Sequence, residues 1–212
     1  MRRAALALAA VAFTALGLAG QASAASGQVT HIRFSGAYAE ASWRTTGATS
    51  ETDTYILVIR SKQGPHLEVA RTTNNFDANG LFTGATETIS DVTSGYSLAI
   101  DLPQLGSATL SGAGLPAQTC TLDANHNVTG CTDATIDVTA AWSGAGPVTH
   151  LVSNNFFRSA GMVVTDHFNG TSRDATATGT FAGRALAAGD LTAADLGVTK
   201  SGTTTSCIGT AC

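Results

Sequence analysis

Short runs of β-branched and apolar residues recur along most of the chain, and turn-favouring residues end each run. The run at 134–142 is the clearest, because Ile136, Val138 and Trp142 alternate with small or polar residues. Alternate side chains of a strand point to opposite faces, so this pattern predicts a half-buried antiparallel strand. The predicted strands are 29–34, 37–43, 54–60, 66–71, 81–89, 96–102, 107–111, 134–142, 148–152, 161–168 and 175–181.

Strands of this length and spacing predict an all-β protein, an antiparallel β-sandwich built as one large or two small related units. The 43% of apolar residues supplies a core. Residues 55–59 are apolar on both faces, which places them in a central strand that is covered on two sides. Little helix is expected, since only 185–196, with Ala, Leu and Asp at mixed spacing, resembles a short helix.

A degenerate repeat divides the chain into two candidate units. The motif Thr-Asp-x-x-Ile-x-Val begins at Thr52 and again at Thr132, and an Asn-Asn-Phe motif recurs at the same offset of 80 residues. The sequence therefore predicts one β unit at 25–131 and a related one at 132–212. One continuous domain is the alternative, because a chain rich in Ala, Thr and Gly also produces chance matches.

Residues 1–24 have the pattern of a cleaved secretory signal peptide. Two arginines precede an apolar run at 4–20, and an Ala-Ser-Ala sequence ends at Ala24. We therefore expect cleavage near Ala24 and an extracellular mature chain. Residue 25 is Ala rather than the Cys of a lipid-anchored precursor, and no second apolar span follows, so no membrane anchor is expected.

All four cysteines follow the leader, and an even number in an oxidising compartment predicts disulfides. Cys120 and Cys131 flank a segment centred on Asp-Ala-Asn, which is typical of a hairpin turn and brings the two cysteines together. Cys207 and Cys212 enclose only four residues. We therefore predict the pairs Cys120–Cys131 and Cys207–Cys212.

Neither a metal site nor a cofactor is expected. The cysteines and histidines lack the spacing of a zinc site. Two Asp-Ala-Asn segments, which begin at Asp77 and Asp123, offer oxygen atoms to calcium but lack the further acidic ligands of a calcium loop. Turns capped by the aspartate side chain account for both segments.

The charge balance excludes two classes of partner. Two of the 11 basic residues lie in the leader, which leaves nine basic residues against 15 acidic ones and no basic cluster. Such a chain is poorly suited to bind nucleic acid or an anionic membrane. Only 12% of the residues are charged, so Thr, Ser, Asn and Gly must cover much of the surface.

The two tryptophans predict different roles. Trp142 is in phase with Ile136 and Val138, so its indole is expected in the core. Trp43 stands beside Arg44 and a polar segment, which makes it the candidate for an exposed residue that stacks on a sugar ring.

Residues 169–174 form the most polar predicted loop. Its Asn169, Arg173 and Asp174 are the remaining candidate ligand-binding residues, because the loop brings an amide, a guanidinium and a carboxylate between two strands. An Asn-Gly turn followed by an Arg-Asp surface pair is the alternative interpretation.

Signatures of catalysis are weak. The histidines at 31, 66, 126, 150 and 167 are scattered, and no Gly-x-Ser-x-Gly motif is present. Asp166 and His167 are adjacent in a predicted strand, so their side chains point to opposite faces. The glutamates at 40, 51, 68 and 87 offer carboxylates for a glycosidase, but the sequence fixes no separation between them.

These observations favour a secreted, non-enzymatic binding or surface-interaction protein, with a glycan or a protein as its extracellular ligand. A secreted hydrolase is the first alternative, and a pocket that holds His150 or His167 near Ser, Asp or Glu would support it. An inhibitor of secreted proteases that presents the braced loop 120–131 is the second.

Overall fold

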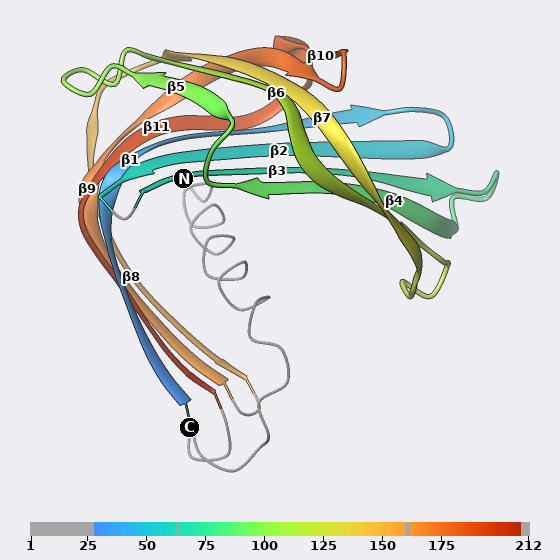
Figure 1. The fold of residues 1–212 in the computed structure, drawn as a ribbon, viewed down its shortest axis with the longest axis horizontal. Coiled ribbons are helices and arrows are strands. Elements are labelled where there is room, and N and C mark those ends of the chain that lie inside the picture. Colours follow the sequence, from blue (N-terminus) through green and yellow to red (C-terminus); the bar gives the residue numbers. More distant parts are fainter. Residues whose placement is uncertain (1–27, 63, 160–161, 209–212) are drawn as a thin grey trace. The chain divides into compact units, whose positions relative to one another are not determined.

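The computed structural model describes residues 28–62, 64–159 and 162–208 (Figure 1). These residues form antiparallel β-strands and one short 3₁₀ helix, so the all-β expectation is confirmed. The elements are β1 (Gln28–Thr46), β2 (Ser50–Ser61), β3 (Gly64–Phe76), β4 (Phe82–Val92), β5 (Tyr96–Ile100), β6 (Ser107–Leu122), β7 (Val128–Gly144), β8 (Thr149–Ser159), β9 (Met162–Phe181), β10 (Arg184–Leu186), the helix η1 (Ala188–Asp190) and β11 (Leu191–Ile208).

The strands form one sheet that folds over itself. Its order is β10-β9-β11-β1-β2-β3-β4-β6-β5, and β7 pairs with both β6 and β9, which closes the pairing into a circuit. The register of β6 and β7 shifts between Gly112 and Leu115. Beyond this shift β6 pairs with β4, whereas its first half pairs with β5 on the opposite side of the core (Figure 1). The predicted sandwich-like arrangement is therefore confirmed.

The hydrophobic core lies between these two layers. Small residues on β1, among them Ala39 and Ala41, leave room for the two indoles. Trp142 donates from Nε1 to the main-chain carbonyl of Glu40 over 2.8 Å, which joins β7 to β1 across the core. The largest fully buried side chains are Trp43, Trp142, Ile56, Leu67, Leu105, Leu115, Leu196, Val58, Val69 and Val138.

The predicted central strand is confirmed as β2, which lies between β1 and β3. Ile56 and Val58 have no exposed surface, and Leu57, on the opposite face, is also buried. A strand that is apolar on both faces is stable here because β1 and β3 pair with both of its edges.

Several predicted boundaries are too short. The predicted strands 29–34 and 37–43 form the single strand β1, although Ser35 and Gly36 stand between them as a turn-like pair. A Cβ at Gly36 would clash with the carbonyl oxygen of Arg60. This glycine therefore permits the close approach of β2 and does not mark a turn.

The short helix expected at 185–196 is wrong. These residues form β10, η1 and the start of β11. Ala194, Leu196 and Val198 contact the core at a period of two, which is the spacing of a strand.

In the described residues no helix has the length and apolar character needed to cross a membrane.

The predicted disulfide Cys120–Cys131 is confirmed and joins directly opposed residues of β6 and β7. The predicted pair Cys207–Cys212 lies outside the described residues, because Cys212 is not among them.

Both Asp-Ala-Asn segments form capped turns. Asp77 Oδ1 accepts hydrogen bonds from the amides of Asn79 and Leu81 at 2.8 and 2.9 Å. Asp123 makes the equivalent pair of bonds in the β6–β7 hairpin.

The chain is grouped by its contacts into two compact units, each made of segments that are separated in the sequence. The larger unit comprises Phe34–Leu151 and Gly170–Lys200, and the described residues of the smaller one are 28–33, 152–159, 162–169 and 201–208. The predicted boundary between 131 and 132 falls inside β7. Ile136 and Val138 are buried, as are their proposed counterparts Ile56 and Val58. The internal repeat stays a prediction.

Candidate functional site

Trp43 is not where the sequence predicts. Its side chain is 2% exposed within the core, so the expectation of an exposed stacking residue is wrong. Ala41 faces the core, and the alternation of β1 places Trp43 on the same face and Arg44 on the outer one. The predicted place of Trp142 in the core is confirmed, since it is 1% exposed.

The predicted loop 169–174 lies inside β9, so the Asn-Gly turn is wrong. A Cβ at Gly170 would clash with the carbonyl oxygen of Val198 on β11. Glycine therefore serves the close approach of two strands at this point.

Arg173 and Asp174 anchor loops to β9. Arg173 donates from Nε to the carbonyl of Gly146 at 2.9 Å and from Nη1 to the carbonyl of Gln104 at 3.1 Å. The main-chain carbonyl of Asp174 accepts from the amide of Ala145 at 2.6 Å. The guanidinium thus bonds main-chain carbonyls instead of the neighbouring carboxylate, which gives Arg173 a structural role.

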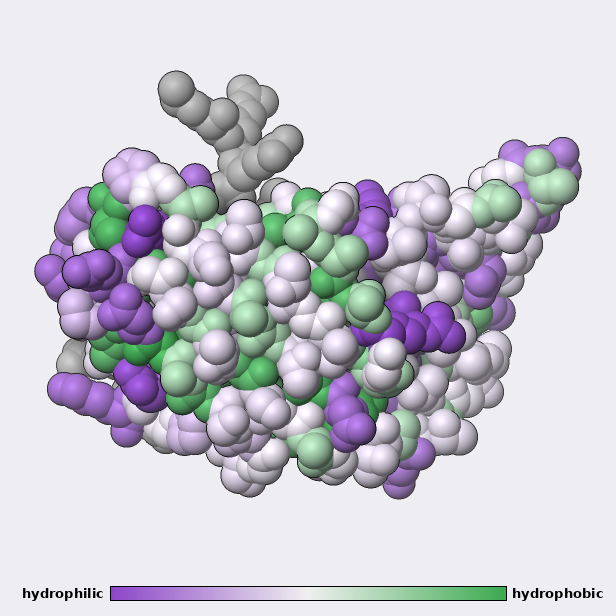
Figure 2. Space-filling model, turned by 90° about the horizontal axis from the view of Figure 1, so that it is seen from above, coloured by the Kyte–Doolittle hydropathy of each residue, from purple (hydrophilic) through white to green (hydrophobic). Residues whose placement is uncertain are grey.

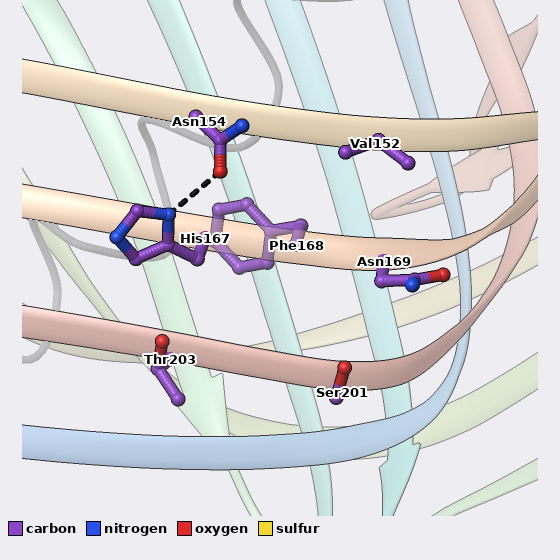
Figure 3. A pocket seen from close by; sticks show the side chains of 7 residues that line it. All are labelled: Val152, Asn154, His167, Phe168, Asn169, Ser201 and Thr203. Atoms are coloured by element: carbon purple, nitrogen blue, oxygen red, sulfur yellow. Dashed lines mark hydrogen bonds between the residues drawn. The ribbon is translucent and has the colours of Figure 1, made fainter.

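Asn169 and His167, both candidates from the sequence, line a hollow. This open hollow of about 200 Å³ lies on β8, β9 and β11 of the smaller unit (Figure 3). His167 Nδ1 and Asn154 Oδ1 are 2.6 Å apart, which fixes the orientation of the ring. An amide oxygen only accepts, so in the neutral ring Nδ1 carries the proton and Nε2 remains an acceptor. The lining residues are Val152, Asn154, His167, Phe168, Asn169, Ser201 and Thr203.

The hollow offers amides, hydroxyls and one imidazole, and its lining includes no carboxylate, Lys or Arg. Figure 3 shows His167 and Thr203 at the same level on neighbouring strands. Drug-sized ligands occupy sites of about 300–1,000 Å³. The hollow therefore suits a smaller, neutral polar group.

A second polar surface, which we call the serine–threonine face, lies on the outer side of β5, β6, β7 and β9 in the larger unit. It comprises Ser97, Ala99, Ser107, Thr109, Ser111, Thr139, Ala141, Ser143, Thr176, Thr178 and Thr180. All of them are exposed except Thr180, which is half-buried. The intervening residues, such as Leu110, Val138 and Ala177, face the core. Strict alternation is thus what separates the hydroxyls from the core.

The strand register arranges this face in rows. Ser111 lies opposite Thr139, which lies opposite Thr180, and the next row contains Thr109, Ala141 and Thr178. The hydroxyls of Thr139 and Thr180 are 2.8 Å apart. Strands are about 4.8 Å apart and alternate residues about 6.7 Å apart, so the face measures roughly 14 by 13 Å. In Figure 2, the view from above the β5–β6–β7 layer is mostly white and green, with most hydrophilic purple residues toward its margins.

An acidic row crosses the opposite part of the larger unit. Glu40 on β1 lies opposite Leu57 on β2, then Glu68 on β3 and Asp91 on β4. Asp195 on β11, the neighbour of β1, forms a hydrogen bond with Glu40. The sequence offered Glu40 and Glu68 as separate carboxylates, but only the register shows that they share one row.

Burial governs the ionisation of this row. Glu40 and Glu68 are each 8% exposed. Burial, followed by the charge and hydrogen bond of Asp195, raises the pKa of Glu40 to about 9. Burial also raises the pKa of Asp195, while hydrogen bonds from Glu40 and Tyr38 oppose that rise. The pair therefore keeps a proton more readily than two separate carboxyl groups would.

Glu68 has a less complete set of partners. Its Oε2 and the hydroxyl of Tyr55 are buried without a hydrogen-bond partner among the described residues. Burial is the main cause that raises the pKa of Glu68, and the charge of Asp91 raises it further. The charge of His66 acts in the opposite direction and lowers this pKa. His66 Nδ1 lies 3.4 Å from Asp91 Oδ1 at the more exposed end of the row.

His126 and His150 lie outside the hollow and the acidic row. His126 stacks on Phe82 with ring centroids 4.4 Å apart, and His150 is exposed. The side chain of His31 lies outside what the structure describes. Among the described residues, no group of His, Cys, Asp and Glu is placed to hold a metal ion.

A scan against protein-family models, a search of curated proteins and a search of solved structures each found no match to this chain. Its function must be inferred from its own residues.

Proposed function

We propose that this chain is a secreted, non-enzymatic protein that binds an uncharged polysaccharide through the serine–threonine face. The observation that carries the proposal is the exposed array of hydroxyls, ordered by the register of four strands. Hydroxyls both donate and accept, so they match the hydroxyls of a neutral glycan. The leader pattern and the disulfide support the extracellular setting.

The dimensions and chemistry of the face favour a glycan over a protein. Standard protein interfaces bury about 800 Å² per partner and depend on aromatic or Arg anchors. The face covers roughly 180 Å² by strand spacing, and it contains no aromatic residue or large apolar side chain. A run of sugar units contacts such a surface without leaving buried charges unpaired.

Depletion by insoluble polysaccharides tests this proposal. Residues 25–212 are mixed with cellulose, chitin or starch, and the unbound protein is measured at increasing salt. We expect binding to at least one neutral polymer, little changed by 0.5 M NaCl because no charge pair is involved. Binding to none of them, or only to anionic polymers such as alginate, would overturn the proposal.

A matched pair of variants locates the surface. Thr109 and Thr178 flank Ala141 in the middle row. Thr109→Val with Thr178→Val keeps the β-branched shape and removes two hydroxyls, so affinity falls roughly 30-fold if each hydrogen bond contributes about 1 kcal/mol. Thr83→Val changes an exposed threonine on β4, away from the face, and leaves affinity unchanged.

A hydrolase is the second candidate, and the hollow is the observation that favours it. Asn154 orients His167, and Thr203 lies at the same level on the neighbouring strand (Figure 3). An oriented imidazole beside a hydroxyl is the arrangement of a general base with a nucleophile. Turnover of ester or glycoside substrates by residues 25–212, abolished by His167→Ala, would favour this candidate.

The inhibitor alternative depends on the hairpin between Cys120 and Cys131. The disulfide braces this hairpin, as an inhibitory loop requires. However, Asp123 closes its tip into a turn through hydrogen bonds to the amides of Asn125 and Asn127. Resistance of the hairpin to cleavage by secreted proteases is the test of this alternative.

A further inference from the structure

Two carboxyl groups from distant parts of the chain meet where β1 and β11 are neighbours. Glu40 on β1 forms a hydrogen bond with Asp195 on β11, and the hydroxyl of Tyr38 donates to the same Asp195 carboxylate. A Cβ at Gly197 would clash with the ring of Tyr38. Glycine at this position therefore lets the tyrosine lie against β11 and reach Asp195.

The groups that act on the pKa values of this pair are acidic or phenolic. The titratable groups that act on it are Tyr38 and Asp174, and Tyr55 and Glu68 extend the same cluster on β2 and β3. No Lys or Arg of the described residues is among the groups that shift Glu40 or Asp195. If both carboxyls ionise, two like charges face each other in a largely buried position, which is strongly unfavourable.

We propose that Glu40 and Asp195 form an acid-closed clasp between β1 and β11, in which one shared proton joins the strands and its loss at alkaline pH drives them apart. The clasp makes the larger unit most stable in acidic surroundings. It operates in the free protein and does not depend on the proposed polysaccharide ligand.

The sign of the pH dependence follows from the proton. The unfolded chain releases the Glu40 proton near its ordinary pKa of about 4.3. The folded chain keeps that proton, because burial and Asp195 raise the pKa of Glu40 to about 9. The stabilisation is thus complete below about pH 4.3 and is lost progressively as the pH rises toward 9.

Thermal unfolding of the full chain between pH 4.5 and pH 9 tests the clasp. We expect the Tm to fall by roughly 5–10 °C between pH 5 and pH 8. Glu40→Gln keeps a donor toward Asp195 at every pH, so its Tm should lose most of this dependence. Glu51→Gln is the matched control, since Glu51 lies near the exposed side chain of Arg44, and it should behave as the wild type. A Glu40→Gln curve parallel to that of the wild type would overturn the proposal.

The difference between wild type and Glu40→Gln, and not the wild-type curve alone, reports the clasp, because other groups of the acidic row, such as His66 beside Asp91, are unchanged in the variant. A direct measurement needs no variant to fold. Carboxyl ¹³C resonances of the wild-type protein should show Glu40 titrating above pH 7. Titration of Glu40 near its ordinary pKa of about 4.3 would also overturn the proposal.

Discussion

The indole Nε1 of Trp142 donates a hydrogen bond to the main-chain carbonyl oxygen of Glu40 over 2.8 Å, although 102 residues separate them. The bond is buried and joins β7, which closes the circuit of strands, to β1 in the opposite layer. Glu40 therefore makes two separate contacts. Its main-chain carbonyl accepts a hydrogen bond from a core indole, and its side chain interacts with Asp195 on the outer side of the sheet.

Trp142→Phe should destabilise the fold strongly. The substitution removes a donor from a buried carbonyl and leaves space that the ring does not fill, so we expect a loss of about 2–4 kcal/mol in the free energy of unfolding. Urea unfolding measures this loss. Trp43→Phe is the control, because Trp43 Nε1 is buried with no hydrogen-bond partner among the described residues. Equal losses in the two variants would show that the hydrogen bond contributes nothing.

Gly179→Ala should weaken the contact between β7 and β9. A Cβ at Gly179 would clash with the carbonyl oxygen of Thr139, and crowding of this kind costs about 1–3 kcal/mol. Gly130→Ala on β7 is the matched control, since a Cβ there meets nothing within 4 Å. The control should be neutral or stabilising by up to about 1 kcal/mol. The proposed crowding is refuted if the two variants have the same Tm.

The sequence predicted the fold class because alternation and turn residues are local signals. Residues 55–59 and 134–142 formed strands as predicted, and Cys120 paired with Cys131 because a hairpin separates them. The same local signals misplaced Trp43, since a neighbouring Arg44 says nothing about which face of β1 is buried.

The candidate sites were less predictable, because they depend on register. Each threonine of the serine–threonine face is an ordinary polar residue in the sequence, and only the pairing of β6 with β7 and of β7 with β9 makes a row. Glu40 and Asp195 are similarly unremarkable until β11 is known to lie beside β1. The sequence analysis predicted a helix at 185–196 and therefore missed the start of β11.

Removal of the Cys120–Cys131 disulfide should have a moderate effect. The bridge closes 11 residues of chain, for which loop closure alone contributes about 3 kcal/mol. The Asp123 turn already favours the hairpin, so we expect Cys120→Ala with Cys131→Ala to cost about 1–3 kcal/mol. Urea unfolding at neutral pH measures this. A loss well above that range would indicate that the hairpin does not form without the bridge.

The turns capped by Asp77 and Asp123 should respond to pH in the sense opposite to the clasp. Hydrogen bonds from main-chain amides, with that of Leu81 first for Asp77 and that of Asn127 first for Asp123, lower the pKa of both carboxyls. The stabilisation is therefore present above the unfolded pKa of about 3.9 and is lost as the pH falls through the lower folded values.

Amide proton resonances of Leu81 and Asn127 report this loss directly. In the wild-type protein both should shift upfield as the pH falls below about 3.9, because the carboxylate loses its charge while its hydrogen bonds weaken. In Asp77→Asn the pH-dependent change of the Leu81 amide resonance should vanish, while that of Asn127 persists. In Asp123→Asn the change at Asn127 should vanish, while that at Leu81 persists. Each variant is thus the control for the other turn. Amide resonances that stay constant between pH 5 and pH 2 in the folded wild type would contradict charge-assisted capping, because neutral hydrogen bonds do not titrate.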